Sequence, residues 1–229
     1  MPCTHRKKAR LAASMIVAAA VLWPSVTMAQ TAPRGTPQGA ATTSAVQAKA
    51  DVAGFRSARF GMTEDEVRKA AAKDLSVKTD AFLVEENAVE RTRVLTVKAS
   101  DVLPDGGKAA VSYILGYTSK KLIQVNALWA ASTDDTMTAE KLVANANVLT
   151  HFFMGQGFEV ETGAVNAVTN GGLIVFRGMD AKKRMVQVSL LGPISVVDNE
   201  QQFTPSALQL SYVMDPVTPD IFRLKPGQF

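Results

Sequence analysis

Few side chains in this 229-residue sequence can act as nucleophiles, bases or metal ligands. Its one cysteine, Cys3, and one of its two histidines, His5, lie before the first apolar stretch, so His151 is the sole imidazole of the remaining chain. Disulfides, cysteine-based zinc sites and Cys–His dyads are therefore excluded for that remainder. A general base also needs a partner and a substrate within hydrogen-bonding reach, and no spacing identifies either. We expect His151 to be structural or exposed.

Carboxylates are the remaining candidates for metal or acid–base chemistry. Acidic pairs occur at Asp134–Asp135 and Glu85–Glu86, but neither follows the spacing of a calcium loop. Asp105 opens an Asp-Gly-Gly sequence that is typical of a hairpin turn. We therefore expect no catalytic, cofactor-binding or metal-binding residue and no cofactor. A hydrolase would instead require convergence among four acids: Asp101, Asp134, Asp135 and Glu159.

An export signal occupies residues 1–29. A basic stretch, His5–Arg10, precedes the thirteen apolar residues Leu11–Trp23 and a small-residue ending at Ala29. This order is that of a cleaved secretory signal, and the apolar stretch is too short to span a membrane. Four of the 25 basic residues lie here, so 21 basic and 21 acidic residues remain. We expect a periplasmic protein with no transmembrane segment in the mature chain and no nucleic-acid partner.

Composition divides the rest of the chain into four parts. Residues 30–54 are rich in Ala, Thr, Gln, Pro and Gly and lack aromatic side chains, so we expect a disordered linker. Two units follow, residues 55–133 and residues 134–216. Residues 217–229 form a C-terminal tail, and we expect its apolar side chains to pack against the folded body.

The two units share one order of elements, a helix followed by three strands. The first helix begins at Thr63, with Glu66 completing a capping box, and the second begins at Thr138. The expected strands are Arg93–Ala99, Ala109–Tyr117, Leu122–Ala130, Leu173–Gly178, Arg184–Leu191 and Ala207–Met214. The sequence thus predicts an α+β fold in which two tandem αβββ units form one antiparallel sheet with helices on one face. The alternative is a single α+β domain without an internal repeat.

The start of the first helix, Gly61-Met62-Thr63-x-x-x-Val67, resembles the helix opening of the BamE (SmpA/OmlA) family of outer-membrane assembly proteins. Tandem helix-plus-strand units are similar to the β-lactamase-inhibitor-protein fold. These resemblances imply a small non-enzymatic envelope module, or an exported protein whose sheet grips a partner. The chain has neither the lipidated cysteine of the first family nor the disulfides of the second, so partner and activity are not carried over.

Strand alternation predicts one apolar face under the helices and one polar face. The polar face carries hydroxyls and amides where a solvent-facing sheet normally carries charges; its members are Thr96, Ser112, Gln124, Asn126, Gln187, Ser189, Gln209 and Ser211. Such groups exchange hydrogen bonds with a partner without the cost of dehydrating ions. We predict that these residues bind a partner, with Tyr117, Leu128 and Phe203 as nearby apolar anchors. A plain hydrated face, or one covered by Ile221–Phe229, is the alternative.

These observations predict an exported, non-enzymatic binding or envelope-associated protein. Its expected partner is a protein or peptide of the cell envelope, engaged through the uncharged polar face. A carboxylate-dependent periplasmic hydrolase is one alternative. The other is a small-molecule carrier with an apolar cavity between the helices and the sheet.

Overall fold

An eight-stranded antiparallel sheet organises the computed structural model, which describes residues 49–100, 102–158, 167–169, 171–197, 200–224 and 227. Its strands lie in the order β3-β4-β5-β6-β12-β9-β8-β7. Their bounds are β3 (Leu83–Glu86), β4 (Arg93–Ala99), β5 (Ala109–Leu115), β6 (Leu122–Ala130), β7 (Ala167–Thr169), β8 (Gly172–Met179), β9 (Met185–Leu191) and β12 (Ala207–Val213). With the helices α1 (Glu64–Asp74) and α2 (Ala139–Met154), the predicted α+β fold is confirmed.

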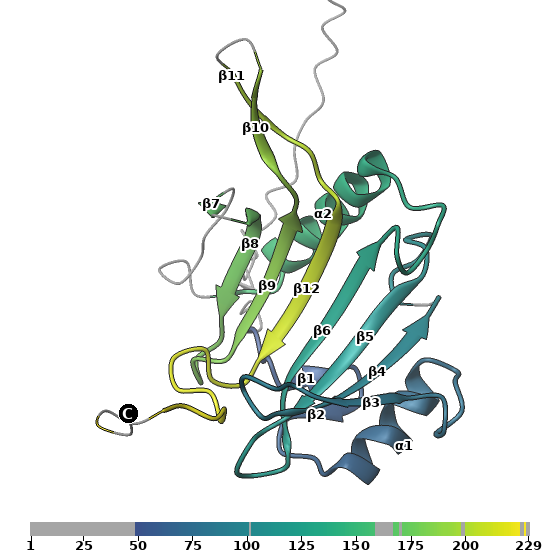
Figure 1. Ribbon diagram of the computed structural model, residues 1–229, viewed down its shortest axis with the longest axis vertical. Helices are drawn as coiled ribbons and strands as arrows, with labels where there is room; N and C mark the ends of the chain where they lie inside the picture. The colour runs from purple at the N-terminus through teal and green to yellow at the C-terminus, as the bar shows by residue number, and fades with distance from the viewer. Residues whose placement is uncertain are drawn as a thin grey trace, which may run out of the picture. The chain divides into compact units, whose positions relative to one another are not determined.

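Two small hairpins accompany the large sheet. β1 (Gly54–Phe55) pairs with β2 (Ala58–Arg59), and β10 (Ile194–Val197) pairs with β11 (Glu200–Phe203). Figure 1 shows the second hairpin extending beyond the end of the sheet. Its strands β10 and β11 and the short edge strands β3 and β7 were not among the strands predicted from the sequence. Charged or very short edge strands lack the alternating pattern that identifies a strand, which explains the omission.

Both helices begin where the sequence predicts. The backbone N–H of Thr63 donates to Glu66 Oε2 at 2.8 Å, and three acids occupy the first turn of α1, where they favour the positive end of the helix dipole. Thr138 Oγ1 accepts a hydrogen bond from the backbone N–H of Lys141 at the start of α2. Each helix is therefore fixed at its first turn before any tertiary packing is considered.

The helices pack on one face of the sheet. Tyr113 lies opposite Val125, which lies opposite Tyr212, so these side chains share a face. Tyr113 contacts Phe82, in the segment after α1, and Tyr212 contacts Phe153 of α2. Apolar side chains from both helices belong to the same buried cluster as these strands. Figure 1 looks onto the opposite face, hereafter the open face, with α2 behind the strands.

The folded body begins before Phe55, which corrects the predicted linker boundary. The backbone N–H of Val52 donates to Asp180 Oδ2 at 2.9 Å, and the Val52 side chain is buried. Asp51 forms an ion pair with Arg184. Residues 50–54 therefore dock on the turn between β8 and β9 because one buried valine and one buried carboxylate hold them. Residues 1–48, including the predicted signal, lie outside the described residues.

Candidate functional site: the open face of the sheet

The structure places all eight predicted partner-binding residues on the open face. Five of them form a row across neighbouring strands, each opposite the next: Thr96, Ser112, Asn126, Ser211 and Gln187. Gln124 lies two residues before Asn126 in β6, on one side of this row. Gln209 lies two residues before Ser211 in β12, on the other side of the row, where it is opposite Ser189. With strands spaced about 4.8 Å apart, the row extends over roughly 20 Å.

Hydrogen bonds along the strands connect these side chains. In β6, β9 and β12, a glutamine amide donates to the side chain two residues on. The three pairs are Gln124 Nε2 to Asn126 Oδ1 at 3.0 Å, Gln187 Nε2 to Ser189 Oγ at 2.8 Å, and Gln209 Nε2 to Ser211 Oγ at 2.9 Å. Thr96 and Ser112 share a further bond of 2.9 Å between their hydroxyls. The polar side chains of this face are therefore hydrogen-bonded to one another and are not independently hydrated groups.

The network also shields its own hydroxyls. Ser189 and Ser211 are 7% and 6% exposed, although no helix covers this face. Their hydroxyls accept the hydrogen bonds that the amides of Gln187 and Gln209 donate. The carbonyl oxygens of Gln124 and Gln209 accept no hydrogen bond from another described residue. These acceptors are therefore available to N–H or O–H donors of a partner.

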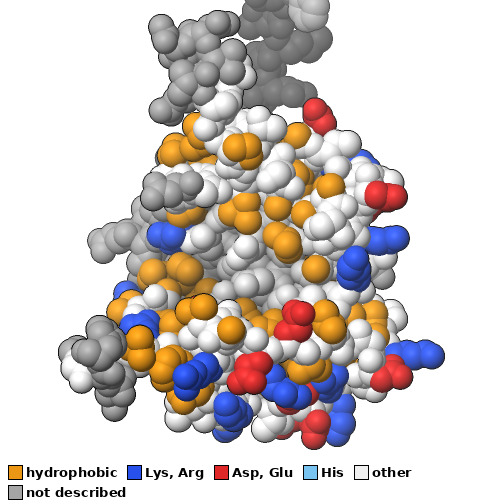
Figure 2. Space-filling model, in the orientation of Figure 1, with side chains coloured by type: hydrophobic (Ala, Val, Ile, Leu, Met, Phe, Trp, Pro, Cys, Tyr) orange, Lys and Arg blue, Asp and Glu red, His pale blue; other side chains and the backbone are white. Residues whose placement is uncertain are grey.

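Charge is confined to the two ends of the row region. Arg177 lies opposite Gln187, and its Nε donates to Gln187 Oε1 at 2.8 Å. Lys98 lies at the other end, on β4. Figure 2 shows the open face, where the centre is uncharged and charged side chains gather toward the α1 end and one flank. The open face thus has an uncharged centre, with Arg177 at one end and Lys98 and the exposed Glu85 at the other.

Sequence reasoning missed Arg177 for a physical reason. The register of β8 shifts between Ile174 and Phe176, so one extra residue, Val175, is accommodated in the strand. Strict alternation from Leu173 would place Arg177 on the buried face, whereas the bulge places it beside Gln187. A run of large apolar residues before an arginine gives no signal of such a bulge.

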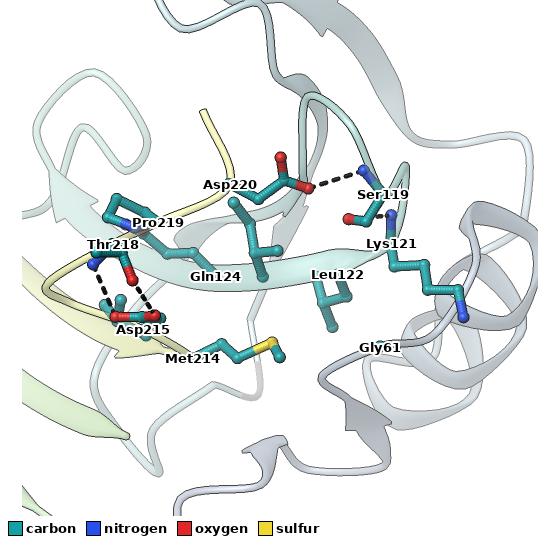
Figure 3. A pocket seen from close by; sticks show the side chains of 12 residues that line it. Gly61, Ser119, Lys121, Leu122, Gln124, Met214, Asp215, Thr218, Pro219 and Asp220 are labelled. Atoms are coloured by element: carbon teal, nitrogen blue, oxygen red, sulfur yellow. Dashed lines mark hydrogen bonds between the residues drawn. The ribbon is translucent and has the colours of Figure 1, made fainter. Parts of the chain in front are cut away.

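The C-terminal segment, from Asp215 to Asp220, borders one end of the open face. A groove of about 290 Å³ runs over Gln124, Gln187 and Gln209 and ends at Pro216 and Pro219. A second pocket of about 240 Å³ lies between β6, the end of β12 and the same segment (Figure 3). Within the described residues, the C-terminal segment therefore borders the predicted face at Asp215, Pro216 and Pro219.

Asp220 fixes this segment to the turn between β5 and β6. Its carboxylate accepts hydrogen bonds from the backbone N–H groups of Thr118 at 2.9 Å and Ser119 at 2.8 Å. Partial burial opposes the charged form, but these bonds outweigh it and lower the pKa of Asp220 to about 2. Asp220 therefore stays ionised at neutral pH and acts as an anchor.

Phe222 supplies a second attachment. Its backbone N–H donates to the carbonyl of Glu90 at 2.8 Å, and its ring meets that of Tyr117 edge-on with centroids 5.5 Å apart. The Arg91 guanidinium lies 3.8 Å from the Phe222 ring centroid. Of the three proposed apolar anchors, Tyr117 is thus occupied by the tail, Phe203 packs against the core cluster, and Leu128 lies on the open face opposite Gln209.

The acidic residues that a hydrolase would use do not form a described cluster. Asp134 accepts bonds from the Lys108 backbone and from the hydroxyl and backbone of Thr136, and these bonds lower its pKa to about 2. It therefore serves as a structural cap. Asp101 and Glu159 lie outside the described residues. Within the described part of the chain, no three His, Cys, Asp or Glu side chains come together as a metal site.

Neither α1 nor α2, the helices of the described segments, is long and apolar enough to cross a membrane. No protein-family model, curated protein or solved structure matches the chain.

Proposed function

We propose that this chain is an exported, non-enzymatic binding protein of the cell envelope that engages a protein or peptide through its open face. The observation that carries the proposal is the uncharged hydrogen-bonded network at the centre of that face. A partner can replace water there without removing ions from solvent, which keeps the desolvation cost low. Uncovered carbonyl acceptors on Gln124 and Gln209 suit the N–H donors of a peptide main chain.

Export through a cleaved signal is part of the proposal. The basic stretch, the apolar stretch and the small-residue ending at Ala29 support it. Cleavage after Ala29 would place the protein in the periplasm of a bacterium with two membranes. Mass determination of the protein recovered from the periplasmic fraction tests this part, because an uncleaved chain would keep residues 1–29.

The order of the strands supports a duplicated architecture. The first helix precedes β3, β4, β5 and β6, which are neighbours in the sheet, and the second precedes β7, β8, β9 and β12, which are also neighbours. The last strand of each run pairs with the other at the centre. We propose two tandem units of a helix and a meander, an arrangement in keeping with the BamE-like or β-lactamase-inhibitor-like resemblance of the sequence.

A charge-insertion experiment tests the proposed function. Substitutions Gln124→Lys and Gln209→Lys together place two cations in the groove, and we expect capture of the envelope partner to be lost. The matched control is Asn147→Lys with Gln156→Lys, which adds the same charge at exposed positions outside the sheet. Both variants are expected to melt close to the wild-type temperature. Retention of the partner by the groove variant would contradict the proposal.

A further inference from the structure

The pocket beside the groove is lined mainly by aliphatic side chains. Leu122 and Ile123 at the start of β6 and Val213 and Met214 at the end of β12 line the pocket, together with Thr218 and Pro219 of the C-terminal segment. Its volume of about 240 Å³ lies below the range of roughly 300–1,000 Å³ that holds a drug-sized ligand. The space therefore suits a single side chain.

The pocket and the groove adjoin each other. Gln124, Val213, Asp215 and Pro219 line both. A chain lying in the groove over Gln187 and Gln209 can thus place a side chain in the pocket without leaving the open face. Main-chain donors would meet the glutamine carbonyls, while the side chain would meet the aliphatic wall.

The lining of the pocket disfavours ionised side chains. Asp215 accepts bonds from the backbone N–H groups of Val217 and Thr218 and from the Thr218 hydroxyl, so its oxygens are already bonded. The carboxylate of Asp220 likewise accepts hydrogen bonds from the backbone N–H groups of Thr118 and Ser119. An entering carboxylate would be repelled by both acids, and the aliphatic wall makes burial of any ionised side chain costly. Lys121 is exposed at the rim, where Figure 3 shows its side chain extending toward Gly61.

We propose that the partner is an extended, uncharged peptide segment with one large aliphatic side chain, such as leucine, that enters this pocket. This inference rests on the proposed function and adds the chemistry of the partner. The pocket supplies apolar burial, which carries the affinity, and the groove supplies hydrogen bonds, which set the orientation.

Short peptides test the proposal directly. The probes are acetyl-Thr-Gln-Leu-Gln-Thr-amide and versions with alanine, glutamate or lysine in place of leucine, titrated into the isotope-labelled protein and followed by NMR. We expect the leucine peptide to shift the methyl signals of Ile123, Val213 and Met214 and the side-chain amides of Gln124 and Gln209. Loss of three buried carbons should make the alanine peptide weaker by roughly tenfold or more. Equal binding of both, shifts elsewhere, or no binding would overturn the proposal.

A charged pocket variant supplies the second measurement. Met214→Glu places a carboxylate in the wall, and the control Val148→Glu makes the same change at an exposed residue of α2. We expect only the first variant to lose the preference for leucine over alanine. If Met214→Glu keeps that preference, the pocket assignment is wrong.

The two proposals fail separately. Gln209 lines the groove but not the pocket, and Met214 lines the pocket but not the groove. Binding that survives Gln209→Lys but loses its leucine preference in Met214→Glu would support the pocket and count against the open face. The reverse result would support the face and count against the pocket.

Discussion

Asp220 accepts a hydrogen bond of 2.8 Å from the backbone N–H of Ser119, a residue 101 positions earlier in the chain. The C-terminal segment is thereby held at the turn between β5 and β6, next to the groove and the pocket. Gly116 permits this contact, because a Cβ atom at that position would lie 2.3 Å from Asp220 Oδ2. The end of the chain is thus built into the candidate site.

Asp220→Asn should loosen the tail while leaving the sheet intact. The variant replaces a charged acceptor of two backbone N–H groups with a neutral group, and one N–H loses its acceptor. We expect a loss of roughly 1–3 kcal/mol in the free energy of unfolding, measured in urea. Asp135→Asn, at an exposed carboxylate, is the control. If the amide hydrogen-exchange rates of Thr118 and Ser119 are the same in the variant and the wild type, Asp220 does not stabilise the attachment of the C-terminal segment.

The contribution of Asp220 should depend on pH in a defined direction. The hydrogen bonds from Ser119 and Thr118 lower the pKa of Asp220 from its ordinary value to about 2 in the folded chain, so the folded state favours the ionised form. This stabilisation is fully present above about pH 4 and is lost as the pH falls toward 2. Melting temperatures of the wild type and of Asp220→Asn should therefore converge over that interval. A constant difference would contradict the assignment.

Gly116→Ala should destabilise the wild type more than it destabilises an Asp220→Gly variant. The added methyl group would lie 2.3 Å from Asp220 Oδ2 and 2.6 Å from Ser119 Oγ, and only the first collision disappears when the carboxylate is removed. A double-mutant cycle in urea measures the coupling between the two positions. Additive effects would mean that the methyl group acts through another contact.

Gln187→Leu should cost more stability than the pair Gln187→Leu with Ser189→Ala. The single change leaves the buried Ser189 hydroxyl without its donor, at a cost of roughly 1–3 kcal/mol. Removing both partners leaves no unsatisfied group at that hydroxyl. Urea unfolding of the single and paired variants checks the order, and a paired variant less stable than the single one would count against the network.

Asp180→Asn should release the segment before β1. Asp180 is 2% exposed, it binds the backbone N–H of Val52, and its ion pair with Arg184 supports the contact of Arg184 with Asp51. We expect faster proteolysis near Val52 with little change in the sheet, monitored by mass spectrometry of the fragments. Asp105→Asn is a suitable control at another turn. Equal cleavage rates in wild type and variant would refute the role of Asp180.

Local sequence signals predicted much of the fold. Capping residues located both helix starts, and apolar–polar alternation located the six central strands and gathered the eight polar residues on one face. The features that escaped prediction depend on distant contacts. The docking of Val52 requires Asp180, the tail anchor requires Asp220 to meet a turn formed far earlier, and the placement of Arg177 requires a bulge. The residues around Asp180, Asp220 and Arg177 in the sequence give no sign of these contacts.

The insertion of β12 between β6 and β9 has a consequence for how the chain becomes folded. Until residues 207–213 arrive, β6 and β9 each present a row of unpaired backbone groups, and the centre of the sheet cannot close. Pairing across such sequence separations is slow compared with helix formation. A chain that folds from its N-terminus would therefore keep two unpaired strand edges until residue 213 has become available.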